Sequence, residues 1–193
     1  MDTLAIFASG SGSNAENIIK YFQNKPGIRV SCICTNNPDA FVIQRAKSYH
    51  IPVLVFSRED FYNTEKVANY LNENKIKWIV LAGFLWLVPG YLIDRFPNRI
   101  INIHPALLPK YGGKGMYGHH VHKAVIENGE LFSGITIHYV NHEYDRGSII
   151  FQSQCPVKAD DTPDSLAERV HRLEYEHFPV IIERELLRGR GNQ

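Results

Sequence analysis

Runs of apolar and β-branched residues alternate along the chain with segments in which apolar positions recur at helical spacing. Runs of the first kind are typical of strands, and segments of the second kind are typical of helices. Strands are predicted at 4–8, 28–35, 53–56, 78–82, 99–104, 134–140 and 149–157, and helices at 15–22, 41–49, 65–73, 121–128 and from 163 to about 187. Pro89 is predicted to open one more helix. The alternation predicts an α/β fold, with a doubly wound, mostly parallel sheet and flanking helices.

The C-terminal part departs from this alternation. The strands predicted at 134–140 and 149–157 follow each other with only a short connection around Asp145. A short connection favours antiparallel pairing, so these strands are predicted to form a C-terminal hairpin. Thr162-Pro163 supplies a capping hydroxyl and a proline, and predicts the start of the last helix. Residues 188–193 are predicted to be a frayed tail.

Composition narrows the class of protein. A chain of 193 residues fits one domain, predicted over 1–193, because single cores usually hold about 100–200 residues. Lys and Arg number 21 and Asp and Glu 20, so the net charge of +1 argues against a nucleic-acid or anionic-membrane partner. The longest apolar stretch, 78–88, is too short for a membrane helix. Cys32, Cys34 and Cys155 are predicted to be buried, reduced thiols, which fits a cytoplasmic location.

The segment Ser9-Gly10-Ser11-Gly12-Ser13-Asn14 lies between the first predicted strand and the first predicted helix. Glycines at such a turn let backbone N–H groups and the helix N-terminus surround a phosphate. A dinucleotide site would need an acidic residue after the second strand, where this chain has Thr35-Asn36-Asn37. A single phosphate, such as a phosphoribosyl group, is therefore favoured over NAD. A plain strand-to-helix turn remains the alternative, since Ser and Asn are also ordinary helix caps.

Asn102 and His104 are two residues apart at the end of a predicted strand, so their side chains point to one face. An amide and an imidazole in one pocket suit acyl transfer, in which both can stabilise an oxyanion. The alternative is a structural histidine. Asp145 alone is an ordinary turn residue. If it reaches His104, its carboxylate is expected to raise the pKa of the imidazole and keep it charged near neutral pH.

His119, His120 and His122 form a cluster near the start of the helix predicted at 121–128. No acidic or thiol side chain is close to them in the sequence, so no metal site is predicted.

Four segments of the chain resemble the folate-dependent phosphoribosylglycinamide formyltransferase family. They are Ser9-Gly10-Ser11-Gly12-Ser13-Asn14, Leu81-Ala82-Gly83-Phe84, the stretch INIHPALLPKY at 101–111, and Asp145-Arg146-Gly147. The likeness runs from Leu4 to about Pro179. It implies a formyltransferase fold with a Rossmann-like N-terminal half, and transfer of a formyl group from 10-formyltetrahydrofolate to the amine of glycinamide ribonucleotide in purine biosynthesis.

The same resemblance implies a role for each matching residue. Asn102, His104 and Asp145 would be catalytic. The substrate's phosphate would lie over Gly12, Ser13 and Asn14, and Glu174 would orient its amine. The folate co-substrate would contact Leu85, Trp86, Leu87, Val88, Asn102, Val140, Asn141, His142, Glu143 and Tyr144, although many members carry Arg at the position of Trp86. The expected partners are these two small molecules, without a metal, and the protein would act as a monomer or homodimer.

Two other classes of function compete with this one. A formyltetrahydrofolate hydrolase or a methionyl-tRNA formyltransferase would share the three catalytic residues, and both are expected to be longer than 193 residues. The near-neutral charge also argues against a tRNA substrate. A non-catalytic nucleotide-binding module would be favoured if Asn102, His104 or Asp145 were missing, and all three are present.

Overall fold

The computed structural model describes residues 1–190 and contains a strand for every strand predicted. The strands are β1 (Asp2–Phe7), β2 (Ile28–Thr35), β3 (Val53–Val55), β4 (Trp78–Leu81), β5 (Ile100–His104), β6 (Phe132–Tyr139) and β7 (Ile149–Pro156). The helices are α1 (Ser13–Phe22), α2 (Val42–Ser48), α3 (Arg58–Tyr62), α4 (Lys66–Glu73), α5 (Gly90–Arg95), α6 (His119–Glu127) and α7 (Pro163–Arg190). The strands follow the order β3-β2-β1-β4-β5-β6-β7 in one mostly parallel sheet, as predicted.

The chain groups into two compact units, a first unit of residues Met1–Ile101 and a second unit that begins at Asn102. That residues 1–193 form a single domain stays a prediction.

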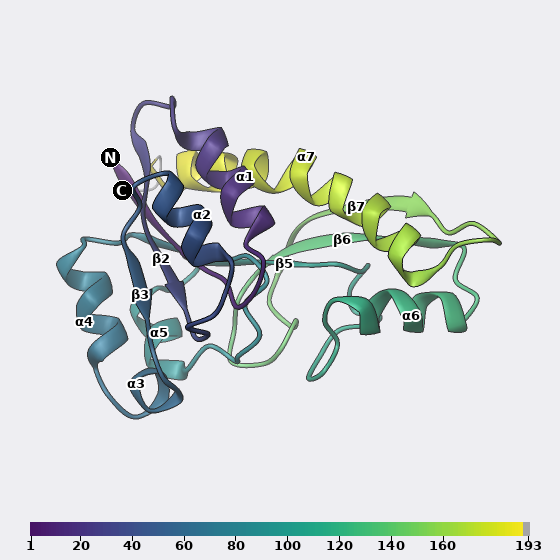
Figure 1. Cartoon of the computed structure of the whole chain (residues 1–193), viewed down its shortest axis with the longest axis horizontal. Helices are drawn as coiled ribbons and strands as arrows, with labels where there is room; N and C mark the ends of the chain where they lie inside the picture. The colour runs from purple at the N-terminus through teal and green to yellow at the C-terminus, as the bar shows by residue number, and fades with distance from the viewer. Residues whose placement is uncertain (191–193) are drawn as a thin grey trace. The chain divides into compact units, whose positions relative to one another are not determined.

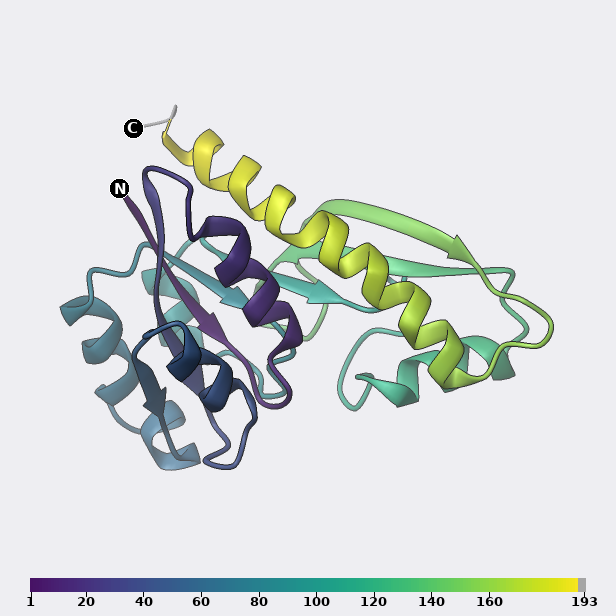
Figure 2. The same cartoon turned by 45° about the horizontal axis from the view of Figure 1, so that its top comes forward.

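The first unit is a doubly wound half-sheet. β1 pairs in parallel with β2 on one side and with β4 on the other, and β3 pairs with β2. The chain moves outward from β1 to β3 and then returns to β4. Because such crossovers are right-handed, α1 and α2 cover one face of the sheet and α3 and α4 cover the other. Figures 1 and 2 show this division. Residues 4–7 of β1 are buried, as expected for a central strand covered on both faces.

The second unit contains the hairpin. β6 and β7 pair antiparallel from Phe132 opposite Pro156 to His138 opposite Ile149, which confirms the prediction. The long helix α7 packs against both strands and contacts α6. Figure 2 shows α7 running along the hairpin. The loop that joins the two strands carries Asp145.

Two elements differ from the prediction. Helix α3 is absent from the predicted set, although Ser57 and Asp60 form a capping box at its start, and this pattern is visible in the sequence. Helix α7 continues to Arg190, so a tail that frays from Arg188 is wrong; residues 191–193 lie outside the described residues.

Two expectations from composition can be compared with the fold. Cys32, Cys34 and Cys155 are free and buried, as predicted. Within residues 1–190, no helix has the length and apolar character needed to cross a membrane.

Candidate active site

The predicted pair Asn102 and His104 lies at the carboxyl end of β5. Alternate residues of a strand share a face, so β5 directs both side chains into the same region. His104 is only 4% exposed, and Asn102 is half-buried. The strand thus places an amide and an imidazole next to each other and shields the imidazole from water.

Thr136 on β6 fixes the loop that follows β5. Its hydroxyl donates to the carbonyl oxygen of Ala106 at 2.7 Å and accepts from the N–H of Leu108 at 3.0 Å. The amide of Gln152 on β7 donates to the same hydroxyl at 2.8 Å and to the Leu108 carbonyl at 3.0 Å. These bonds satisfy buried polar groups and hold the start of the loop on the hairpin.

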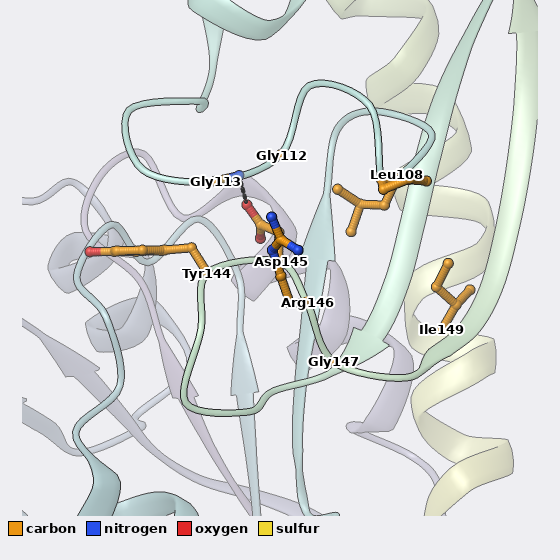
Figure 3. Close-up of a pocket in the computed structure, with 9 residues that line it drawn as sticks. Leu108, Gly112, Gly113, Tyr144, Asp145, Arg146, Gly147 and Ile149 are labelled. Carbon is orange, nitrogen blue, oxygen red and sulfur yellow. Dashed lines mark hydrogen bonds between the residues drawn. The ribbon is translucent and has the colours of Figure 1, made fainter.

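Asp145 reaches His104 from the loop between β6 and β7. Its Oδ2 lies 3.6 Å from Nδ1 of His104 and accepts a hydrogen bond from the N–H of Gly113 at 2.9 Å. Figure 3 shows this bond between the two loops. At Gly112, an added Cβ would lie 2.5 Å from Leu108 Cδ2 and 3.2 Å from Asp145 Cβ. Glycine therefore permits the close approach that positions the carboxylate.

A cavity of about 360 Å³ lies next to Asp145 within the second unit. In Figure 3, Tyr144 extends to one side, Leu108 and Ile149 lie on the other, and Asp145 and Arg146 lie between them. The remaining lining residues are Pro109, Gly112, Gly113 and Gly147. The volume lies within the range of small-molecule sites, about 300–1,000 Å³.

Burial lowers the pKa of His104, and the carboxylate of Asp145 raises it. Burial is the larger effect, so the pKa of His104 lies below the ordinary value of 6.5. The prediction that Asp145 keeps this imidazole charged near neutral pH is therefore wrong. Nε2 lies 2.7 Å from the carbonyl oxygen of Tyr111 and donates its proton to that oxygen, which assigns the lone pair of the neutral ring to Nδ1.

Burial raises the pKa of Asp145, but nearby groups lower it by more. The imidazoles of His138 and His104 and the N–H of Gly113 all favour the carboxylate, and they hold its pKa below the ordinary value. Asp145 is therefore ionised at neutral pH.

Asn102 has two further partners. Its Nδ2 lies 3.0 Å from Nε2 of His138 and 3.4 Å from Oδ1 of Asp145. His138 lies on β6, is 2% exposed, and places Nδ1 2.8 Å from the carbonyl oxygen of Tyr139. His138 is not among the site residues predicted from the sequence. A signal was present, since His138 is a polar residue in a largely apolar strand, two positions after Thr136.

Glu174 lies on α7 and is buried. Its carboxylate accepts a hydrogen bond from Nδ1 of His171 at 2.7 Å, which raises the pKa of His171 against the effect of burial. The charge of Glu174 also favours protonation of His104 and His122. A buried carboxylate in this environment can accept hydrogen bonds from an amine.

The glycine segment, residues 9–14, lies in the first unit and comprises part of the turn after β1 and the first two residues of α1. Gly12 has a φ of 70°, a conformation that favours glycine. A Cβ there would lie 2.4 Å from a side-chain carbon of Val42. Arg45 donates to the carbonyl oxygen of Ser11 at 2.9 Å and forms an ion pair with Glu16. Helix α2 therefore braces the turn that precedes α1.

Asn36 and Asn37, found where a dinucleotide site needs an acid, support the same turn. The hydroxyl of Ser9 donates to Oδ1 of Asn36 at 2.7 Å, and Nδ2 of Asn37 donates to the Ser9 carbonyl at 3.3 Å. The Ser9 hydroxyl also accepts from the N–H of Leu85 at 3.1 Å. These amides fix the backbone of the glycine segment.

Comparison with known proteins identifies the family. The sequence pattern of formyl transferases matches residues 2–182. The chain belongs to the formyl transferase family. It is 43% identical over 185 residues to the chloroplastic phosphoribosylglycinamide formyltransferase of Arabidopsis thaliana, which covers 93% of this chain and 63% of that protein.

Other relatives match over more of their length. Phosphoribosylglycinamide formyltransferase of Bacillus subtilis is 33% identical, with 100% of both chains covered. The crystal structure of phosphoribosylglycinamide formyltransferase from Bacillus halodurans superposes with a TM-score of 0.86 at 33% identity, covering 96% of this chain and 95% of that chain. By contrast, this chain spans 63% of the Arabidopsis protein and 59% of the Vigna unguiculata relative.

The predicted folate segment of the first unit, residues 85–88, is only partly accessible. Leu85 is exposed and Val88 is buried. Trp86 belongs to an aromatic cluster with Phe56, Phe61, Tyr62 and Phe84, and the guanidinium of Arg58 lies 5.7 Å from the centre of its ring. The side chain at this position therefore packs on its own unit.

The predicted folate segment of the second unit, residues 140–144, lies in the loop between β6 and β7. Asn141 orders it: its Oδ1 accepts from the N–H of Glu143 at 3.1 Å, and its Nδ2 donates to the Arg146 carbonyl at 3.0 Å. Within the loop, backbone groups and the Tyr144 ring next to the cavity can contact a ligand.

The three clustered histidines differ in their exposure to solvent. His122 is 2% exposed, and its Nδ1 has no hydrogen-bond partner among the described residues. Burial and the nearby His171 lower its pKa to about 4. His119 and His120 are exposed. Within residues 1–190, no group of three or more His, Cys, Asp and Glu side chains could hold a metal ion.

Proposed function

We propose that this formyl transferase moves the formyl group of 10-formyltetrahydrofolate to the amine of glycinamide ribonucleotide. The products are formylglycinamide ribonucleotide and tetrahydrofolate, and the reaction is a step of de novo purine biosynthesis. The observation that carries the proposal is the convergence of Asn102, His104 and Asp145, of which Asp145 also lines a cavity of about 360 Å³. The names of the relatives support the choice of substrates.

Asn102, His104 and Asp145 have different roles in the transfer. During transfer, the amine nitrogen bonds to the formyl carbon, and the bond from that carbon to the folate nitrogen breaks. An N–H of Asn102 stabilises the oxyanion that forms on the formyl oxygen. His104, neutral because burial lowers its pKa, accepts the proton that the amine loses and returns it to the departing folate nitrogen. Asp145, ionised and 3.6 Å away, stabilises the imidazolium between these two transfers.

The remaining predicted residues bind the two substrates. We assign the phosphate to Gly12, Ser13 and Asn14, because α1 begins at Ser13 and its first backbone N–H groups have no acceptor within the helix. Glu174 would accept hydrogen bonds from the glycinamide amine. The folate would contact the backbone of residues 85–88 and 140–144, together with Asn102. Since Trp86 packs in an aromatic cluster, its contribution would come from its backbone.

Further expectations accompany this assignment. The protein would act in the cytoplasm as a monomer or homodimer, on two small molecules, without a metal ion or a nucleic-acid partner. The two plant relatives are named as chloroplastic, so location can differ between members.

A release assay tests the proposal. The protein is mixed with 10-formyltetrahydrofolate, with and without glycinamide ribonucleotide, and tetrahydrofolate formation is followed. The proposal predicts release that depends on the ribonucleotide. Equal release without it would identify a hydrolase, and no release with both present would indicate a non-catalytic binding module.

A further inference from the structure

We propose that His138 is a positioning residue that fixes the orientation of the Asn102 amide. The inference rests on the proposed function, because its importance lies in which atoms of Asn102 can face the formyl oxygen. His138 contacts Asn102, and it acts through this side chain. Three observations carry the argument: the partner of His138 Nδ1, the partner of its Nε2, and the position of Asp145.

The ring of His138 is held by the backbone of its own strand. Nδ1 lies 2.8 Å from the carbonyl oxygen of Tyr139, which has lone pairs and no proton. A favourable contact at this distance requires a proton on Nδ1. The neutral ring then carries its lone pair on Nε2. Because His138 is 2% exposed, water does not compete for that lone pair.

The lone pair on Nε2 determines how Asn102 is turned. The amide atom 3.0 Å from Nε2 must be a donor, which is the Nδ2 nitrogen of Asn102. Oδ1 of Asp145, 3.6 Å from Nε2, is too far for a hydrogen bond, so Asn102 is the nearer partner. The bond from Asn102 therefore fits a His138 ring that carries its lone pair on Nε2.

Asp145 favours the same orientation independently. Nδ2 of Asn102 lies 3.4 Å from Oδ1 of the carboxylate. If the amide were flipped, its carbonyl oxygen would take this place and face a negatively charged oxygen. Both His138 and Asp145 therefore disfavour the flipped orientation of the Asn102 amide. His138 holds one N–H at 3.0 Å and Asp145 holds the other at 3.4 Å, so the formyl oxygen would take the place of Asp145, the more distant acceptor, on the second N–H.

Two matched substitutions test the positioning role. His138→Asn keeps a donor near the Nδ1 position and removes the acceptor, whereas His138→Gln can place an acceptor near the Nε2 position. We expect His138→Asn to lower kcat about 10- to 100-fold, with KM for both substrates little changed, since small misplacements of catalytic groups have effects of this size. His138→Gln should recover most of the lost rate. Equal losses in the two variants, or wild-type kcat in His138→Asn, would overturn the proposal.

A double substitution separates positioning from a general structural role. In an Asn102→Ala background, His138→Asn should not lower kcat further, because the amide that it orients is gone. A second loss as large as that of the single variant would contradict the proposal. Thermal unfolding of each variant checks that it is folded.

The ring itself can be observed without any activity. Imidazole ¹⁵N shifts of the wild-type protein at neutral pH should show His138 protonated on Nδ1 alone, with the signal assigned by its disappearance in His138→Gln. A ring protonated on Nε2, or on both nitrogens, would overturn the proposal. The measurement stands even if the release assay fails, so the failure of this inference and that of the proposed function are distinguishable.

Discussion

The glycine segment, proposed to bind the substrate's phosphate, and the catalytic centre, proposed to transfer the formyl group, are built in opposite ways. The glycine segment of the first unit uses contiguous residues, 9–14, and offers mostly backbone groups. The catalytic centre of the second unit combines buried histidines from β5 and β6 with a half-buried carboxylate from the loop that follows β6. The glycine segment contains no titratable side chain. The catalytic centre depends on ionisable groups, and burial and nearby side chains shift the pKa of His104 and Asp145.

This difference separates the effects expected from substitutions. A change in the glycine segment should act through the shape of the backbone, and therefore on folding and on affinity for the phosphate. A change in the catalytic centre should act on charge, and therefore on turnover and on pH dependence. Substitutions at Asp145 and at Gly12 test this separation, and a substitution at His122 tests how burial affects charge elsewhere in the second unit.

Replacing Asp145 by Asn should affect turnover most. The variant keeps the shape of the side chain and removes the charge that stabilises the His104 imidazolium. We expect kcat to fall about 100- to 1,000-fold, comparable to the loss of one electrostatic group in an active site, with KM little changed. Steady-state kinetics with both substrates measures the effect, and the exposed Asp160→Asn is the control. Near wild-type turnover in Asp145→Asn would remove Asp145 from the mechanism.

His122 should make the fold sensitive to acid. Its pKa is about 4 in the folded protein and about 6.5 when unfolded, so the folded state favours the neutral ring. The stability from this neutral ring is complete above pH 6.5 and declines as the pH falls toward 4. The loss approaches about 3 kcal/mol.

Urea unfolding at several pH values tests this in His122→Gln and in the exposed control His120→Gln. The first variant should lose less stability between pH 6.5 and 4 than the wild type, and the second should follow the wild type. An unchanged pH profile in His122→Gln would be inconsistent with a buried neutral ring.

Gly12→Ala tests whether the glycine segment depends on the conformation of its backbone. The φ of 70° and the contact with Val42 should together cost about 2 kcal/mol of unfolding free energy. Gly10 is the matched control, since nothing lies within 4 Å of a Cβ added there. Chemical denaturation compares the two alanine variants. Similar stabilities would show that the turn is less constrained than its geometry indicates.

The same contrast explains what the sequence could reveal. The glycine segment and the pair Asn102 and His104 are local patterns, visible from spacing alone. The hairpin also followed from the short connection between its strands. That Asp145 lies 3.6 Å from His104 depends on how the hairpin folds back, which spacing does not determine.

The wrong expectation for the pKa of His104 and the omission of His138 from the predicted site both have physical causes. The pKa of His104 was predicted from one neighbour, but its direction results from burial opposed by Asp145. His138 belongs to β6 and becomes part of the centre only when that strand lies near Asn102. Neither burial nor this contact is local in the sequence.

Labelling the formyl carbon tests the central claim most directly. The protein is incubated with 10-formyltetrahydrofolate that carries ¹³C in its formyl group and with glycinamide ribonucleotide, and the label is followed by NMR. The label should appear in the formamide of the ribonucleotide product, at a rate that falls with Asp145→Asn. Accumulation of labelled formate, with no labelled ribonucleotide, would contradict formyl transfer.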